Sequence, residues 1–593
     1  MQKPLPREWL LSGQKRLRTF DASLITKALE RLRPENMRLV IVSQEYPGNW
    51  DKREYWYGTE YRHEKIPPSL MAELQAALKM FKDKRLPELH LPHKNNFIPD
   101  KFEVEKKEVS KPALAPLILR NDQGARTWWK KDDTFWVPKA NVFVSLQNPI
   151  IYASVGNRVK ATLFTQLVDD ALEEYSYKAA LAGLQYSNSL DTRGLCIKLS
   201  GYNEKLPVML EQVVNTMRDL DIQEDRFRIV HERLIRAYEN SQLESSFQQI
   251  GGYLSWLNAE TLYHLEEMAA ELKHATADAV RHFQMQILSQ LYIEVYAHGN
   301  LSPGDAVKLT DMVESTLRPR PLPRSHWPII RSLILPRGSN YVYKKELKDP
   351  QTINHCIETW FYVGDQGDRQ FRAKTLLTAQ MIQEPAFDQL RTKEQLGYIV
   401  FSGTRSFSTT SGIRFLIQST QKLKYIDRRI EAFLAQFGQK LEQMSDSEFE
   451  NHKRSLTLRR LEKLRDLDQE SSRHWDQIDG EYYDFELNQH DAAHLRPLTK
   501  TEMVQFYKTY FHPCSSTRSR ISVHLKARGL DTKVMEILKE AVVATNVSTK
   551  DTSAVDRAQA ITDVHQFKAA LVASPGARPV KQASEFEETD ARL

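Results

Sequence analysis

The sequence predicts an α+β protein made of tandem repeated α/β domains, each with a mixed, mostly antiparallel sheet and helices packed on one face. Helix-like and strand-like segments alternate along the 593 residues, and the order of segments returns in the second half of the chain. The two copies of this order of segments can also be aligned in amino-acid sequence. A chain of this length has room for about four domains, or three large ones with connectors.

The first elements are a helix, a turn and a strand. The apolar residues of ASLITKALERL fall at helical spacing, RPEN is typical of a turn, and RLVIVSQ is a short run rich in β-branched residues. This helix and strand have the same form as the end of each later repeat. We therefore expect the opening segment to be the tail of a unit whose front is absent, either because the natural protein is longer or because the gene encodes a shortened form.

Two longer repeats follow a connector that is rich in prolines and charged residues. The first contains strands in TFWVPKANVFVSLQ, a long helix from Arg158 to about Leu184, a strand at GLCIKLSGY and helices that end in SQLYIEVYAHGN. The second contains a strand at HCIETWFYV, a long helix from about Arg372, a strand at GIRFLIQS and a final strand in SRISVHLKA. The proline-rich stretch RPRPLPRSHWP separates the two repeats and is typical of a linker.

The alignment of the two repeats needs few gaps. Three pairs of residues anchor it, with an offset that grows slowly along the chain: Gly183 with Gly397, Gly194 with Gly412, and Phe227 with Phe449. Each copy of the repeated unit therefore runs to more than 200 residues.

The composition excludes several classes of protein. Lys and Arg number 83 against 77 Asp and Glu, and a net charge of +6 over this length does not indicate a nucleic-acid partner. Three cysteines exclude a disulfide framework and fit a reducing compartment. No uncharged apolar run approaches the ~18 residues of a membrane span, so we expect a cytoplasmic protein without a membrane partner. The C-terminal tripeptide Ala591-Arg592-Leu593 resembles a peroxisomal address, which makes the peroxisome the alternative location.

The segment FDQLRTKEQLGYIVFSGTR closely resembles the insulin-degrading enzyme branch of the pitrilysin family. Further pieces are similar to the same enzymes in the same order, over about residues 20–530: LRPENMRLVIVS, WYGTEY, NNFIPDKF, ALAGLQYS, GYNEKLPV and YAHGN. Members of this family are zinc metalloendopeptidases made of four similar α/β domains. The resemblance implies a pitrilysin-like metallohydrolase fold, and it is to the C-terminal half of these enzymes.

The resemblance also implies the domain boundaries. The expected order along the chain is the end of a truncated second pitrilysin-like domain at 1–65, a connector at 66–111, a third domain at 112–330, a fourth at 345–545 and a largely mobile tail at 546–593. Within the tail, only TDVHQFKAALVASPG indicates a docked helix.

Family members hold zinc in the first domain on an H-x-x-E-H helix, so the resemblance implies zinc in the complete enzyme, held outside this chain. The nearest approach here is His264-Leu-Glu-Glu-Met268, where methionine occupies the second ligand position. An amphipathic helix with a surface carboxylate pair explains that segment better. Two other histidine pairs lack a suitable setting and read as surface or chance pairs, His490 with His494 and His90 with His93. We therefore expect no metal ligands in this chain.

The resemblance assigns Arg391 and Tyr398, in RTKEQLGY, to the substrate backbone and the oxyanion, across the chamber from the zinc. A guanidinium can hold a carbonyl or carboxylate, and a tyrosine hydroxyl can donate to the charge that develops during peptide hydrolysis. The alternative reading is a solvated arginine at a helix end and a strand tyrosine packed in the core. The other repeat has Tyr177 and Leu184 at these positions, so it lacks the polar pair.

Basic residues cluster in SLTLRRLEKLRDLD, which reads as one helix. The resemblance points to a polyanion or nucleotide effector site here, with Lys463 and Arg465 as its residues. The local sequence departs from the family pattern, with leucine where a proline is common and one fewer lysine. The alternative is a solvated helix face on which Glu462 and Asp466 are interspersed among the basic residues.

Two hypotheses for the function follow. In the first, the chain is the substrate-chamber half of a zinc metalloendopeptidase, acts on peptide substrates with a zinc-bearing N-terminal half, and is inactive alone. In the second, it is a non-catalytic peptide-binding or regulatory partner of an intact homologue. Whether this chain alone counts as an enzyme is open, and a homo-oligomer is compatible with both. Nucleic-acid binding is a distant third.

Overall fold

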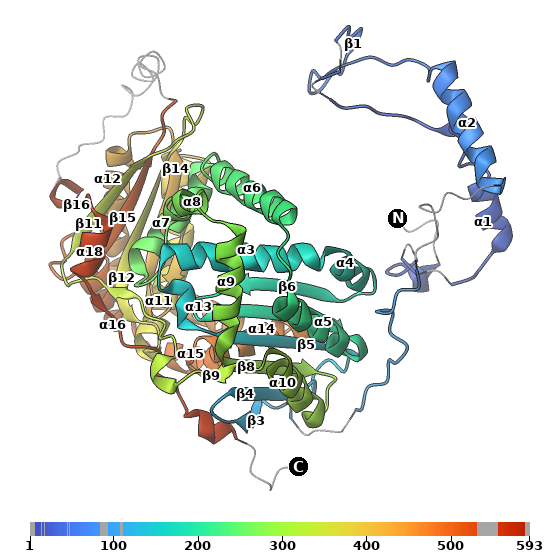
Figure 1. Ribbon diagram of the computed structural model, residues 1–593. Helices are drawn as coiled ribbons and strands as arrows, with labels where there is room; N and C mark the ends of the chain where they lie inside the picture. The colour runs from blue at the N-terminus through green and yellow to red at the C-terminus, as the bar shows by residue number, and fades with distance from the viewer. Residues whose placement is uncertain are drawn as a thin grey trace. The chain divides into compact units, whose positions relative to one another are not determined.

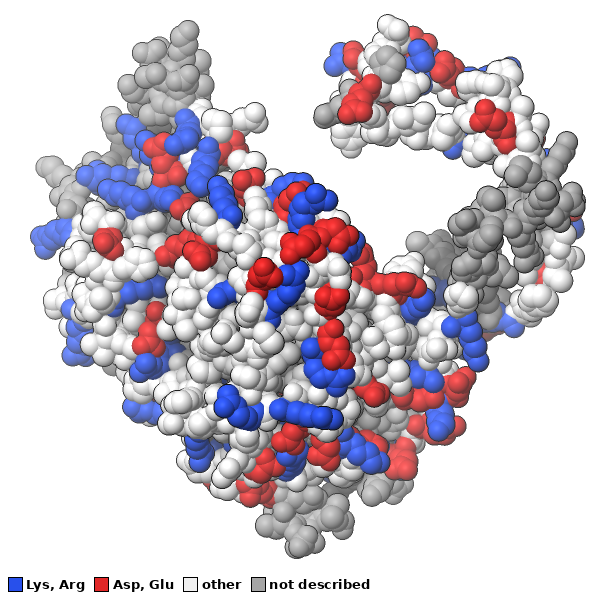
Figure 2. Space-filling model, in the orientation of Figure 1, with Lys and Arg blue, Asp and Glu red and all other residues white. Residues whose placement is uncertain are grey.

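The computed structural model describes residues 6–13, 15–16, 18–43, 45–46, 48–83, 93–106, 111–529 and 555–587. It divides into two compact units, Met1–Lys94 and Asn95–Leu593 (Figure 1). No helix in these described ranges is both long and apolar enough to cross a membrane. Basic and acidic side chains are interspersed over the face drawn in Figure 2, in keeping with the small net charge.

The first unit contains short elements. Its bounds are η1 Arg7–Trp9, α1 Ala22–Leu29, η2 Pro34–Asn36, β1 Lys52–Arg53, β2 Glu60–Tyr61 and α2 Pro68–Asp83. Helix α1 begins where predicted, because the Asp21 carboxylate accepts hydrogen bonds from the Ser23 and Leu24 amides at its N-terminus. The strand predicted at RLVIVSQ is wrong for this structure: residues 38–43 form no regular element. A strand requires a hydrogen-bonded neighbour, and no described residue supplies one.

The second unit begins with a seven-stranded sheet in the order β3-β4-β8-β5-β7-β6, with β9 beside β8. Its strands are β3 Leu117–Asn121, β4 Ala125–Lys131, β5 Lys139–Gln147, β6 Gln185–Leu190, β7 Gly194–Tyr202, β8 Gln290–Gly299 and β9 Arg320–Pro321. Pairing is antiparallel except that β8 runs parallel to β4 and β9. The expected mixed, mostly antiparallel sheet is confirmed.

Helices cover one face of this first sheet (Figure 1). They are η3 Pro149–Tyr152, α3 Val155–Ala171, α4 Glu173–Leu181, η4 Asn203–Lys205, α5 Leu206–Asp219, α6 Glu224–Ser241, α8 Leu265–Leu272, α9 Ala277–Ser289 and α10 Pro303–Leu317. The core includes alternate residues of β5 such as Val142 and Val144, together with Phe164 of α3 and Val213 of α5. The long helix predicted from Arg158 is two helices that meet at Leu172.

The second repeat has a six-stranded sheet in the order β13-β14-β12-β15-β11-β16. Its strands are β11 Asn340–Glu346, β12 His355–Asp365, β13 Ile399–Ser406, β14 Thr410–Ser419, β15 Ser519–Lys526 and β16 Gln559–Ile561. One face is covered by helices α11 Arg369–Ala386, η6 Phe387–Lys393, α12 Leu423–Gln443, α13 Asp446–Arg460, α15 Leu487–Leu495 and α16 Lys500–Tyr510.

The opposite face of each sheet is covered by a helix from the other repeat, which the sequence did not predict. Helix α7, Ser246–Asn258, packs Tyr253 and Trp256 with Trp360 of the second sheet. Helix α14, Leu467–Asp479, packs Trp475 on Phe143 of the first sheet, with ring centroids 5.1 Å apart. The alignment anchored at Phe227 and Phe449 makes α7 and α14 equivalent. Each repeat therefore contributes the equivalent helix to the sheet of the other repeat.

Residues 555–587 lie within the predicted tail and pack against both sheets. Strand β16 extends the second sheet, and β17 Val572–Ala573 pairs with β10 Leu333–Ile334. The segment read as a docked helix contains α18 Val564–Ala569, while η7 Val555–Arg557 precedes it and η8 Ala583–Phe586 brings Phe586 against Trp128. Residues 546–554 and the C-terminal tripeptide Ala591-Arg592-Leu593 lie outside the described residues.

Candidate functional site

Arg391 and Tyr398 lie on the turn that connects α11 to β13. Helix α11 contains Pro385 in its last turn and runs directly into η6, a π-helix. Proline lacks the amide that would donate in the α-helical ladder, which favours a change of helix type at this point. Single π-turns of this kind occur frequently at functional sites.

The structure brings the two predicted site residues together. The Arg391 Nε donates a 3.2 Å hydrogen bond to the Tyr398 carbonyl oxygen. The Arg391 guanidinium lies over two aromatic rings, 5.0 Å from the centroid of Phe387 and 5.1 Å from that of Tyr398. Tyr398 is 84% exposed. Its hydroxyl is therefore presented to solvent, and the reading of Tyr398 as a packed core tyrosine is wrong.

Several backbone features fix the path between the two residues. The Glu394 and Leu396 amides donate to the Gln389 and Leu390 carbonyl oxygens and close the turn. Gln395 follows in a left-handed conformation, with φ of 51°. At Gly397 a Cβ would lie 1.9 Å from the Gln418 carbonyl oxygen, so only glycine allows the chain to join the sheet there.

An ion pair anchors this turn to α12. The guanidinium of Arg429 donates two hydrogen bonds to the Glu394 carboxylate, at 2.7 and 2.6 Å. The Gln389 side-chain amide donates a third hydrogen bond to Glu394, at 2.7 Å. The Glu394 bonds in turn raise the pKa of Arg429. A bidentate pair of this geometry gives directional as well as electrostatic stabilisation.

An open pocket of about 410 Å³ is lined by Phe387, the residue whose ring lies under the Arg391 guanidinium. Phe387, Val400 and Phe401 give it apolar walls, and Glu384 and His452 add polar groups. Burial lowers the pKa of His452, which favours its neutral form. The pocket can take an apolar side chain, and Phe387 connects it to the half-buried Arg391 guanidinium.

The equivalent place in the first repeat is built differently. Tyr177 lies exposed on α4, whereas Leu184 is buried in the core. The first repeat therefore presents no hydroxyl and guanidinium pair at this position, as the alignment predicted.

Lys463 and Arg465 lie in a loop, which corrects the prediction that they share a helix with Arg459. Helix α13 ends at Arg460, and α14 begins after Asp466, whose carboxylate accepts from the Gln469 amide. Both basic side chains are exposed, and Arg465 forms a 3.0 Å ion pair with Glu462. They are near in sequence but do not form one helical face.

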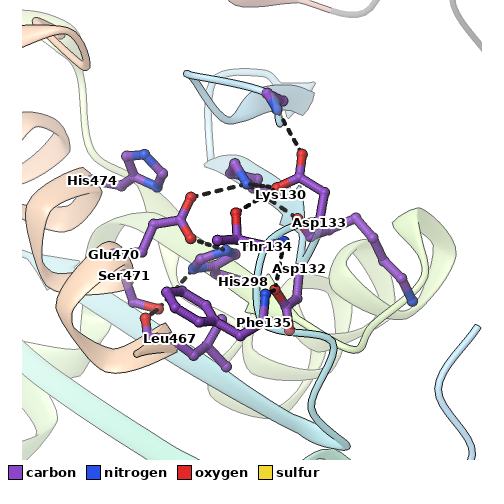
Figure 3. Close-up of polar contacts among 12 residues, drawn as sticks. Lys130, Asp132, Asp133, Thr134, Phe135, His298, Leu467, Glu470, Ser471 and His474 are labelled. Atoms are coloured by element: carbon purple, nitrogen blue, oxygen red, sulfur yellow. Dashed lines mark hydrogen bonds and ion pairs between the residues drawn. The ribbon is translucent and has the colours of Figure 1, made fainter. Parts of the chain in front are cut away.

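A buried polar network holds the helix that follows this loop against the first sheet (Figure 3). The Lys130 ammonium forms ion pairs with Asp133, at 2.7 Å, and Glu470, at 3.1 Å. His298 Nδ1 donates to the Ser471 hydroxyl at 2.8 Å, because that hydroxyl already donates to the Leu467 carbonyl oxygen. Burial raises the pKa of Glu470 and lowers that of His298 well below its usual value.

The described part of the chain contains no group of three His, Cys, Asp or Glu residues arranged to hold a metal ion. His264 precedes α8 and caps it with Glu267, so it does not lie within the helix that we predicted. His490 lies 2.5 Å from Asp484, and His494 bonds the His490 carbonyl oxygen, both through Nδ1. His90 lies outside the described residues. The described imidazoles of His264, His490 and His494 thus take part in helix capping or hydrogen bonds.

Sequence reasoning missed several residues that build the site: Phe387, Glu394, Gln395 and Arg429. Pro385 near a helix end was a usable signal for the break that presents Phe387. No local pattern could have paired Glu394 with Arg429, because the partner is on another helix.

Comparisons with known proteins agree with this fold. A model described as the middle or third domain of peptidase M16 matches residues 1–271, and one described as the PQQ synthase PqqF-like C-terminal lobe domain 4 matches residues 377–475. In the solved structure of pitrilysin, 56% of that chain superposes on 94% of this one with a TM-score of 0.74 at 21% identity. A peptidase M16 inactive domain from Pseudomonas fluorescens covers 70% of this chain and 98% of its own, with a TM-score of 0.52 at 11% identity.

The fold and the matching family models define a pitrilysin-type chain, which is similar to the pitrilysin (M16) family of peptidases. Within it, the chain resembles insulin-degrading enzyme. It is 33% identical to the human enzyme over 97% of this chain and 56% of that protein. It is 34% identical to a putative zinc protease, mug138, of Schizosaccharomyces pombe over 100% of this chain and 58% of that protein. It is 31% identical to a peroxisomal insulin-degrading enzyme-like protein of Arabidopsis thaliana over 88% of this chain and 54% of that protein. The chain thus spans little more than half the length of these relatives.

Proposed function

We propose that this chain is the substrate-chamber half of an insulin-degrading-enzyme-like zinc metalloendopeptidase. The observation that carries the proposal is the pair of Arg391 and Tyr398, joined by a 3.2 Å hydrogen bond on one π-turn with the tyrosine exposed. The relatives are named as proteases, which supports peptide hydrolysis as the activity of the complete assembly.

The two side chains have separate tasks in this proposal. The Arg391 guanidinium binds a carbonyl or carboxylate of the peptide, and the flanking rings of Phe387 and Tyr398 hold it in place. The Tyr398 hydroxyl donates a hydrogen bond to the oxyanion that develops when the peptide bond is attacked. Zinc would activate water and polarise the carbonyl, and we place its ligands outside this chain. The chain alone is then inactive.

Reconstitution tests this function. The purified chain is mixed with a zinc-bearing N-terminal half of an insulin-degrading enzyme, and cleavage of a fluorogenic peptide is followed. We expect cleavage only in the mixture, and Tyr398→Phe should lower kcat roughly 100-fold with little change in KM, because it removes one oxyanion donor. Tyr177→Phe, at an exposed position of the other repeat, is the matched control. Chelator-sensitive cleavage by the chain alone, or a Tyr398→Phe mixture as active as the parent, would contradict the proposal.

A second candidate is a non-catalytic peptide-binding or regulatory partner of an intact homologue. The fold shared with a solved M16 inactive domain favours this alternative. The same mixing experiment separates the two, since peptide binding without turnover is expected of a regulatory partner. The proposal also includes a polyanion or nucleotide effector near Lys463 and Arg465. A cytoplasmic location is proposed, with the peroxisome as the alternative.

A further inference from the structure

A second cavity, of about 200 Å³, lies at the end of α11 opposite to Phe387. Helices α11, α13 and α15 pack together there (Figure 1). Polar side chains line the cavity from four separate segments: Gln366 before α11, Arg372 in its first turn, Arg460 at the end of α13 and Asp484 before α15. The cavity shares no lining residue with the pocket at Phe387, so it is a separate site.

A cluster of ion pairs forms the floor of this cavity. Arg372 Nε donates a 2.6 Å hydrogen bond to one oxygen of Asp491, and Arg460 donates to the other oxygen. The Arg369 and Arg372 guanidiniums each lie 3.6 Å from Asp484 Oδ2, too far for a hydrogen bond. Three guanidiniums thus face two carboxylates, and the cluster carries one uncompensated positive charge.

Four buried polar atoms around the cavity form no hydrogen bond with any residue that the structure describes. They are Gln366 Oε1, Asp484 Oδ2, Arg372 Nη2 and Arg460 Nε. The Asp484 side chain is only 3% exposed, and its other oxygen lies 2.5 Å from His490 Nδ1. Buried polar atoms are nearly always paired, because an unpaired one is costly. The cavity therefore combines unused donors with unused acceptors, as a site for a polar ligand does.

The unused groups define the chemistry of the ligand. The net positive charge requires a ligand with one negative charge, and guanidiniums bind a carboxylate well. The two unused oxygens require an N–H donor on the same molecule. A simple carboxylate such as acetate supplies no such donor, and a free amino acid is zwitterionic and leaves the positive charge uncompensated. The C-terminal residue of a peptide has both features, a carboxylate and a neutral amide N–H.

The mouth of the cavity also suits a peptide. It is lined by Thr404 and Ser406, two exposed residues at the end of β13. Strand β13 is at the edge of its sheet, and among the described strands it pairs only with β14. The free edge of a strand offers main-chain donors and acceptors to an extended peptide. Leu376 and Leu487 add an apolar wall for the terminal side chain.

We infer that this cavity binds the C-terminal residue of a peptide, with its carboxylate between Arg372 and Arg460 and its amide N–H donating to Gln366. The preceding residues follow the free edge of β13, which begins directly after Tyr398. This inference rests on the proposed function, because it adds an anchor for the same peptide substrates. A peptide with a free C-terminus is therefore held at the far end of the strand that follows the Arg391 and Tyr398 pair.

Peptide binding to the full chain tests this inference without any cleavage. The probe is a fluorescein-labelled octapeptide that ends in leucine, with either a free or an amidated C-terminus, and binding is followed by fluorescence polarisation. We expect the acid to bind at least roughly tenfold more tightly than the amide, because amidation removes the charge that the guanidiniums hold. N-acetyl-leucine should displace the acid at lower concentration than free leucine or acetate does.

Two variants and a control locate the site. Arg460→Gln should remove the preference for the acid, because it deletes one guanidinium of the cavity. Val580→Trp should weaken binding by narrowing the mouth, where Val580 is 40% exposed, and it leaves the ion pairs intact. Arg459→Gln is the matched control: this neighbour on α13 is exposed, bonds Gln380 and does not line the cavity, so the preference should persist. Circular dichroism checks that each variant is folded, and Val580→Trp decides if Arg460→Gln is not.

The inference is overturned if neither peptide binds, if acid and amide bind alike, or if both cavity variants bind like the parent. Displacement by acetate as effective as that by N-acetyl-leucine identifies a general anion site and also overturns it. Binding that prefers the acid, in a chain that fails to restore cleavage with a zinc-bearing half, supports the inference and contradicts the proposed function. Restored cleavage without a preference for the acid has the opposite meaning.

Discussion

At the scale of single residues, Gln395 and Gly397 determine where Tyr398 points. Gln395 has a φ of 51°, a conformation that costs most side chains roughly 1–2 kcal/mol. Gly397 lies so close to the Gln418 carbonyl oxygen that any side chain would clash. The chain therefore reverses within a few residues and returns Tyr398 to the guanidinium of Arg391. Strain of this kind is common where a protein orients functional groups.

Replacing Gln395 by glycine should relieve that strain. Gln395→Gly is expected to raise the free energy of unfolding by up to about 1 kcal/mol, since glycine adopts positive φ freely but is more flexible when unfolded. Urea denaturation measures the change. Lys393→Gly, two residues earlier in the π-helix, is the control and should lower stability by about 1 kcal/mol. Equal losses from both substitutions would contradict the strain at Gln395.

At the scale of elements, the π-helix is positioned by its contact with α12. The Glu394 and Arg429 side chains are only 13% and 14% exposed, so their pairing is shielded from water. The same π-helix carries an exposed pair, Lys393 with Asp388, at 2.7 Å. Exposed ion pairs contribute little because water screens them, so the inner pair determines the orientation of the turn.

Glu394→Gln should therefore destabilise the turn. It leaves Arg429 without a charged partner and is expected to cost about 2 kcal/mol of unfolding free energy. It should also speed amide exchange over residues 391–398. Asp388→Asn, in the exposed pair of the same helix, is the control and should change both quantities little. An Asp388→Asn effect as large as that of Glu394→Gln would argue against anchoring by α12.

At the scale of the whole second unit, α7 and α14 hold the two repeats together, because each helix packs on the sheet of the other repeat. Helix α14 places His474 in the buried interface, where its Nδ1 lies 2.8 Å from the Tyr296 hydroxyl. Burial, followed by the charge of Lys130, lowers the pKa of His474 to about 3. The folded chain therefore keeps His474 neutral where the unfolded chain, with a pKa near 6.5, would take up a proton.

This difference predicts acid lability of the interface. Stability from neutral His474 is complete above about pH 6.5 and is lost as the pH falls toward 3, by about 1.4 kcal/mol per pH unit. Between pH 7 and pH 5, the free energy of unfolding of His474→Gln should fall by about 2 kcal/mol less than that of the parent, as measured by urea denaturation. His282→Gln, at an exposed helical position, is the control and should behave like the parent. Equal pH dependence for parent and His474→Gln would exclude this role.

The sequence by itself determined the repeated α/β architecture, and its resemblance to a known family singled out Arg391 and Tyr398 as a pair. These are carried by periodicity, by glycines that the backbone requires, and by a motif that is contiguous in the chain. The loop at Lys463 was also readable, because Asp466 is a good helix cap, although the run of basic residues led to a helix prediction.

The tertiary structure alone decided the features that join distant segments. They are the packing of α7 and α14 on the sheet of the other repeat, the anchoring of Glu394 by Arg429, the burial of His298 and His474, and the solvent exposure of Tyr398. Each depends on which surfaces meet in space, and burial and pairing energies are set by those contacts and not by the neighbouring letters. Residues 38–43 show the same division, because their letters specify a strand but only a neighbouring sheet can make them one.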